Sequence, residues 1–151
     1  MIAIKPHHFV DIITALGGGQ TEFQPHPYGH AAHLIAKEIL GNPNVDLRIE
    51  LGADDICHPC RHHNGGLCED IIDNSFRPQA PQSKREYNLL IDQRWSERLG
   101  LHQGDQLTAH ELCWRIRDLA GNLEDIYRET PSDRTAERQA KLRQGVVKFP
   151  E

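Results

Sequence analysis

The sequence predicts a single α+β domain that is mostly helical, with a small two-stranded sheet beside a cysteine-rich loop. Three patterns predict it: strict alternation of apolar and charged residues over 45–51, helical spacing of apolar residues elsewhere, and three of the four cysteines within residues 57–68. A chain of 151 residues is long enough for one domain with its own core. We expect one domain over 1–151, in which 1–73 holds the sheet, two helices and the cysteine loop, and 83–148 forms a helical half.

The N-terminal part supplies both predicted strands and two of the helices. Residues 2–4 form a short apolar strand that ends before Pro6. Helices are expected over 7–16 and 29–40, where apolar residues recur at spacings of three and four. The alternation over 45–51 predicts a strand with one buried face. Because helices lie between the two strands, we expect them to pair in parallel.

The C-terminal part begins its helices with capping signals. Ser83 is followed three residues later by Glu86, and Thr108 by Glu111, which are capping-box patterns. The first predicts a helix to Leu99. The second predicts a helix with four residues on its core face: Leu112, Cys113, Ile116 and Leu119. Two further segments, 122–127 and 132–147, also look helical, and 74–82 reads as a proline-rich loop.

Composition limits the classes of function. The formal net charge of −5 argues against a nucleic-acid coat, which needs a surplus of positive charge. Five basic residues in 131–151 are typical of a solvated helix face, with a nucleic-acid arm as the alternative. No apolar run approaches the roughly 20 residues that span a bilayer, and the N-terminus lacks the pattern of a signal peptide. We therefore expect a soluble cytoplasmic protein that does not bind membranes.

The cysteines form the strongest chemical signal. Cys57, Cys60 and Cys68 follow a C-x2-C-x7-C pattern, and Cys113 lies on a later helix. Cytoplasmic cysteines stay reduced, so such a cluster indicates a metal or catalysis. Four thiolates suit an iron–sulfur cluster or a Zn²⁺ ion.

The uneven cysteine spacing favours an iron–sulfur cluster over zinc. Structural zinc sites usually have two matched Cys-x-x-Cys pairs, and this chain has one. A [4Fe–4S] cluster suits three loop thiolates plus a distant fourth from Cys113. Alternatively, Cys113 is a buried core cysteine, and the cluster then has an open iron. The sequence Cys57-His58-Pro59-Cys60 also fits a thioredoxin-like dithiol, but Gly65-Gly66 would interrupt the helix that such a motif opens.

Ten histidines accompany the cysteines. His7 and His8 begin a helix and would lie near the cysteine loop if the two strands pair. His33 shares a helix face with His30. We therefore predict His7, His8 and His33 as candidate catalytic residues.

The cysteine ligands are flanked by other polar residues. Three histidines are expected to hydrogen-bond to sulfur or to face solvent: His58, His62 and His63. Asp54 and Asp55 are placed to cap the loop through its backbone amides.

Two short motifs resemble a known family. Pro6-His7-His8 near the start and Asp54-Asp55-Ile56-Cys57 after a strand are similar to a family of short, uncharacterised bacterial and archaeal proteins. Its members typically open with Pro-His-His-Leu-Leu-Cys, and some carry further cysteines after Asp-Asp-Ile-Cys. They are suspected of binding a metal or an iron–sulfur cluster. The likeness covers about residues 5–70 and implies a metal site without implying a reaction.

The chain departs from that family in one ligand position. The family's early cysteine corresponds to Asp11, so Cys113 replaces the missing thiolate, Asp11 ligates through oxygen, or the site is open. The sequence thus predicts an iron–sulfur protein that acts in electron transfer with a redox partner, or as a small cluster-dependent enzyme on a small-molecule substrate. The alternative is a zinc-stabilised structural or interaction module.

Overall fold

A three-stranded sheet lies at one side of the protein. The computed structural model describes residues 1–64, 67–68, 70–72 and 75–150. Strand β1 (Ile2–Ile4) pairs in parallel with β2 (Asp46–Ile49), as predicted, with Ile2 opposite Leu47. Strand β5 (Gln106–Thr108) adds an antiparallel edge to β2. This third strand was not predicted, because three residues with one apolar side chain, Leu107, are too few to establish an alternating pattern.

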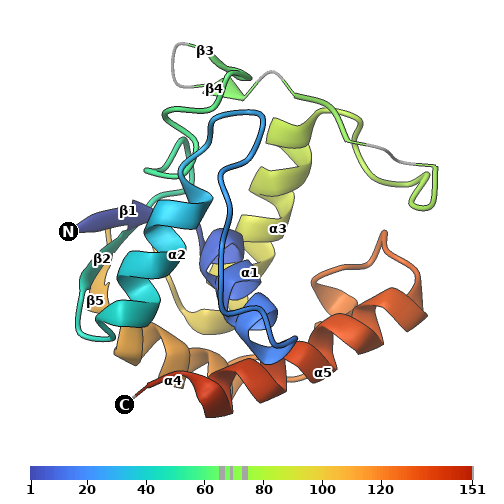
Figure 1. The fold of residues 1–151 in the computed structure, drawn as a ribbon. Coiled ribbons are helices and arrows are strands. Elements are labelled where there is room, and N and C mark those ends of the chain that lie inside the picture. The colour runs from blue at the N-terminus through green and yellow to red at the C-terminus, as the bar shows by residue number, and fades with distance from the viewer. Residues whose placement is uncertain (65–66, 69, 73–74, 151) are drawn as a thin grey trace.

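Helices make up most of the remaining fold, and the predicted α+β class is confirmed (Figure 1). The α-helices of the described ranges are α1 (Pro6–Gly17), α2 (Ala32–Gly41), α3 (Lys84–Leu99), α4 (Ala109–Leu119) and α5 (Ser132–Lys148). The predicted caps begin two of them. The Ser83 side chain accepts from the Glu86 amide, and Thr108 and Glu111 form a complete capping box. Over 122–127 the structure has a single 3-10 turn, η1 (Leu123–Asp125).

Within the described ranges, no helix has the length and apolar character needed to cross a bilayer.

Helix α5 packs directly along α1 (Figure 1). Glycines make this close approach possible. A Cβ added at Gly17 would overlap the Lys141 carbonyl, and one added at Gly145 would overlap the Ile13 carbonyl. The backbones of the two helices are therefore in contact where these glycines lie. This contact packs the C-terminal half of α1 against α5.

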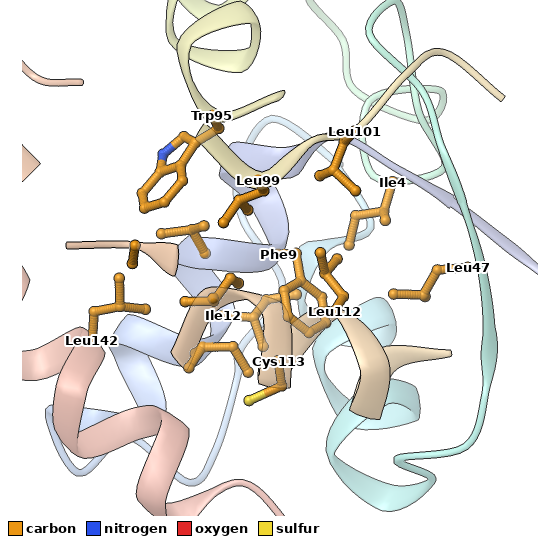
Figure 2. Packing of buried hydrophobic residues seen from close by; sticks show 14 of the residues in the cluster. Ile4, Phe9, Ile12, Leu47, Trp95, Leu99, Leu101, Leu112, Cys113 and Leu142 are labelled. Atoms are coloured by element: carbon orange, nitrogen blue, oxygen red, sulfur yellow. The ribbon is translucent and has the colours of Figure 1, made fainter. Parts of the chain in front are cut away.

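The hydrophobic core lies between the sheet and the helices. Figure 2 shows Phe9 of α1, Leu47 of β2 and Trp95 of α3 converging on Leu112 and Cys113 of α4. All are buried. On α4 the buried face follows the prediction except at Leu119, which is 48% exposed.

The parallel pairing of β1 and β2 positions the candidate site. Helix α1 begins directly after β1, and the segment 50–62 begins directly after β2. Since both strands run the same way, the first turn of α1 and this segment emerge at one end of the sheet. Further along lies a small hairpin of β3 (His63–Asn64) and β4 (Leu67–Cys68).

Candidate metal centre and the adjoining cavity

A buried carboxylate, Asp54, joins the first turn of α1 to the cysteine loop. One carboxylate oxygen accepts from the Lys5 amide at 2.8 Å and from His8 Nδ1 at 2.7 Å. The other accepts from the amides of Ile56 and Cys57, both at 3.1 Å. Asp54 is fully buried. Its four hydrogen bonds confirm that it caps the loop through backbone amides, and they also fix the position of His8.

The neighbouring Asp55 was also predicted to cap the loop, but among the described residues its carboxylate bonds to β1 instead. Its carboxylate accepts from the amide of Ala3 at 2.9 Å, and its own amide donates to the Ala3 carbonyl. Asp55 therefore ties the loop to β1 and does not reach the histidines.

His8, Asp54 and Cys57 together form a possible metal site. One potential ligand atom from each lies within 4.8 Å of the other two. No other set of three or more such groups occurs among the residues that the structure describes. The predicted metal-binding character is thus supported at the level of a His/Asp/Cys group, with a donor set of nitrogen, oxygen and sulfur.

The hydrogen bonds determine which form each group adopts. Burial alone would raise the pKa of Asp54, but the charge of His8 and the hydrogen bonds from His8 and Lys5 hold it well below its usual range. A carboxylate only accepts, so His8 Nδ1 carries the proton and donates it. Burial and the charge of His7 lower the pKa of His8 below 6.5, and Asp54 offsets only part of this. His8 is therefore neutral at pH 7, with Nε2 free to bind a metal.

The Cys57 thiol is protonated in the absence of a metal. Burial, followed by the negative charge of Asp54, raises its pKa to about 11. A catalytic dithiol needs a lowered thiol pKa, so this environment argues against the thioredoxin-like alternative. A metal ion would displace the thiol proton directly.

A second buried carboxylate holds His7 beside His8. Asp92 of α3 accepts from the His7 amide at 2.8 Å, and its two oxygens lie 2.8 and 2.9 Å from His7 Nδ1. Burial lowers the pKa of His7, but the charge and hydrogen bond of Asp92 outweigh it, and the pKa is raised above 6.5. The two imidazole rings are 4.2 Å apart between centroids. Adjacent histidines thus have pKa values displaced in opposite directions, which is typical of acid–base pairs.

Both histidines line one small cavity of about 230 Å³. Its wall comes from α1, α3, α5 and the connecting segments. Basic and phenolic side chains complete it: Arg77, Lys84, Tyr87, Tyr127 and Arg138. The candidate metal group and this cavity therefore share His8 as a common wall.

The four predicted cysteine ligands fall in different environments. Cys57 and Cys60 lie on one turn, in which the Cys60 amide donates to the Cys57 carbonyl at 2.9 Å. Cys68 lies in β4, where the backbone pairs with His63, but its side chain and that of His63 are outside the described part of the structure. Cys113 lies in the core, and burial raises its pKa to about 12.

Cys113 is not brought to the cysteine loop. In Figure 1 its helix, α4, lies at the bottom of the molecule, whereas the β3–β4 hairpin lies at the top. Figure 2 shows Cys113 among the apolar side chains of the core. The structure thus places Cys113 as a core residue and does not group it with Cys57 or Cys60.

Two other predicted residues lie apart from the group. Asp11 lines the cavity, but its carboxylate pairs with Arg138 at 2.8 Å. His33 lies partly buried on α2, and its Nδ1 has no hydrogen-bond partner among the described residues. His30 lies closer to the site, because the charge of His8 acts on it. Burial is the main cause that lowers the pKa of His30, and the charges of His26 and His8 lower it further.

The segment that carries His30 packs on the cysteine loop. The Ala31 amide donates to the Ile56 carbonyl at 3.0 Å, and the Arg61 amide donates to the Tyr28 carbonyl at 2.6 Å. Gly29 has φ of +77°, and a Cβ there would lie 3.3 Å from the Pro59 carbonyl. Glycine is needed for both reasons.

Asp92 is the functional residue that the sequence interpretation missed. It lies on the buried face of α3 between Ile91 and Trp95, and it is fully buried. A single acidic residue at a core position of an amphipathic helix signals a buried partner. That signal was present in the sequence, but its partner, His7, lies 85 positions away.

Comparisons with protein-family models, with curated proteins and with solved structures found no match to this chain.

Proposed function

We propose that this protein is a metal-dependent enzyme whose metal is bound by His8 and Cys57 and whose substrate enters the cavity beside His7. The observation that carries the proposal is the group of His8, Asp54 and Cys57, with ligand atoms within 4.8 Å of one another. This group adjoins a cavity, and a purely structural metal site needs none.

Asp54 orients the proposed ligands. Its oxygens are occupied by four hydrogen bonds, two from the loop amides and two from the start of α1. A histidine that donates one ring proton to a carboxylate and offers its other nitrogen to the metal is common in metal sites. Of the three groups, we propose His8 and Cys57 as the direct ligands, with Asp54 beside them as the carboxylate that orients His8.

The metal supplies either Lewis-acid or electron-transfer chemistry, according to its identity. We propose an iron–sulfur cluster as the finer form of the centre, because Cys60 shares a turn with Cys57 and the chain returns through the strand that carries Cys68. His8 then takes the fourth position that Cys113 was predicted to fill. A single Zn²⁺ ion held by the same loop is the second candidate, favoured by the mixed nitrogen and sulfur donors.

His7 is the proposed acid–base residue. Asp92 fixes its Nδ1, so Nε2 is the atom available to the cavity. The pKa of His7 is raised and that of His8 lowered, so the protonated form is favoured at His7, which is the residue we propose as the proton donor to a bound substrate.

Metal analysis of anaerobically purified protein tests the proposal. We expect stoichiometric metal in the wild type, its loss in Cys57→Ser and His8→Gln, and its retention in the matched control Cys113→Ser. A brown protein with broad visible absorption supports the iron–sulfur form, and a colourless protein with one zinc supports the second candidate. Wild-type protein without metal, or His8→Gln with full metal content, contradicts the proposal.

Chelation separates an enzyme from a structural zinc module. Here the loop is already held by Asp54 without a metal, so we expect the metal-free protein to remain folded by circular dichroism. A module that depends on zinc unfolds when the metal is removed.

A further inference from the structure

Two side chains that line the cavity beside the histidines, those of Tyr87 and Arg77, each carry a buried polar atom. The Tyr87 hydroxyl and Arg77 Nε are both buried, and neither has a hydrogen-bond partner among the described residues. Tyr87 as a whole is only 6% exposed. Buried polar groups in proteins are nearly always hydrogen-bonded. Two unpaired donors at one cavity therefore indicate a group that fills it.

The cations around the cavity are not equally engaged. Arg138 pairs with Asp11 at 2.8 Å, and Lys84 pairs with Asp70 at 3.3 Å. Arg77 has no carboxylate partner in the described ranges of the chain. Its guanidinium lies 4.7 Å from the centre of the Tyr87 ring, which keeps it against the cavity wall. One guanidinium at the cavity is thus held against an aromatic ring and, among the residues that the structure describes, is not paired with a carboxylate.

We propose that the cavity binds a small molecule through a carboxylate or phosphate group, held by Arg77 and the Tyr87 hydroxyl. A planar guanidinium matches the oxygens of such groups, and a phenol adds a neutral donor. The volume of about 230 Å³ is below the range typical of drug-sized ligands, which restricts the ligand to a small compound. Lys84 and Arg138 also line the cavity, but each is paired with a carboxylate, so Arg77 is the cation assigned to the ligand. The remainder of the ligand faces His7 and His8.

This inference deepens the proposed function, because it names the substrate class of the same site, and its anion-binding step does not require the metal. The Arg77 side-chain Nε–H gives an NMR signal that can be followed directly, and Arg77→Lys assigns it by its loss. Inorganic phosphate and acetate are the two probes. Titration of each into the purified full-length protein distinguishes a phosphate-bearing ligand from a carboxylate-bearing one.

We expect a saturable shift of the Arg77 signal with at least one probe. Calorimetry of the variants should show roughly tenfold or weaker binding in Arg77→Lys, which keeps the charge but removes Nε and the planar fork. Tyr87→Phe removes only an unpaired hydroxyl, so it should fold normally by thermal melting and bind several-fold more weakly. Arg134→Lys is the matched control, since the guanidinium groups of Arg77 and Arg134 both lie over the Phe76 ring but Arg134 does not line this cavity.

The absence of a saturable shift with both probes overturns the inference, as does unchanged affinity in both Arg77→Lys and Tyr87→Phe. Failure of the two proposals can be told apart. If the protein binds the anion but holds no metal, only the metal proposal is contradicted. If the protein holds metal through Cys57 but binds neither probe, only the anion site is contradicted.

Discussion

Cys57 and Cys113 are both thiols with raised pKa values, but their surroundings differ in kind. Cys57 lies in a loop that is organised by a buried carboxylate, next to a neutral histidine. Cys113 lies among apolar side chains of the core, where desolvation is the leading cause of its raised pKa. The comparison teaches that cysteine count and spacing do not identify ligands. A ligand also needs a second donor and a framework that holds both.

The largest expected effect comes from removing the carboxylate that organises the Cys57 region. Asp54→Ala leaves three backbone amides and His8 Nδ1 without their acceptor. We expect a loss of roughly 3 to 5 kcal/mol in the free energy of unfolding, measured by urea denaturation. We also expect loss of bound metal.

Asp55→Ala is the matched control for this change. Asp55 has a single side-chain hydrogen bond, to the Ala3 amide, so its removal should cost about 1 kcal/mol. Equal losses in the two variants would mean that Asp54 has no special role in the loop.

Replacement of each cysteine by serine should have a different effect on stability and metal content at the two positions. Cys113→Ser places a hydroxyl in the core, where Cys113 is 2% exposed, and should cost about 1 to 3 kcal/mol by urea denaturation. Its metal content should not change. Cys57→Ser should lose the metal while the metal-free protein keeps its stability within about 1 kcal/mol.

The reverse pattern would restore the original prediction. If Cys113→Ser abolishes the metal, the centre is held by four thiolates, and the core position of Cys113 must rearrange when the metal binds.

Local patterns in the sequence predicted most of the fold. The alternation over 45–51 predicted β2, the apolar residues 2–4 predicted β1, and the helices between them predicted the parallel pairing. The capping residues Ser83 and Thr108 predicted the starts of α3 and α4. Strand β5 was missed because three residues carry too little periodicity. The close contact of α1 with α5 depends on Gly17 and Gly145, which are far apart in sequence.

The candidate site was predictable only in part. His7, His8 and Cys57 were identified from motifs and spacing, and Asp54 was expected to cap the loop. The grouping of His8 with Cys57 depends on the pairing of two strands more than 40 positions apart. Asp92 reaches His7 from α3, and Arg77 lines the cavity from a connecting segment, and no local pattern connects either residue with His7.

The smallest expected effect, and the sharpest test of the paired histidines, is the pH dependence of stability. The pKa of His7 is raised on folding, so its contribution is fully present below about pH 6.5 and is lost as the pH rises through the folded value. The pKa of His8 is lowered, so its contribution is present above pH 6.5 and is lost as the pH falls below it. Urea denaturation of metal-free protein from about pH 5 to 8 measures both effects.

The two single variants should therefore differ in sign. Relative to the wild type, His7→Gln should lose most stability at the acidic end of the range, because it removes the favourable pairing of an imidazolium with Asp92. His8→Gln should remove the loss that the wild type suffers on acidification, because glutamine cannot take up the proton that burial disfavours. Parallel pH profiles for the two variants would show that the pKa values of His7 and His8 are not displaced in opposite directions. His7 would then not be the acid beside the metal.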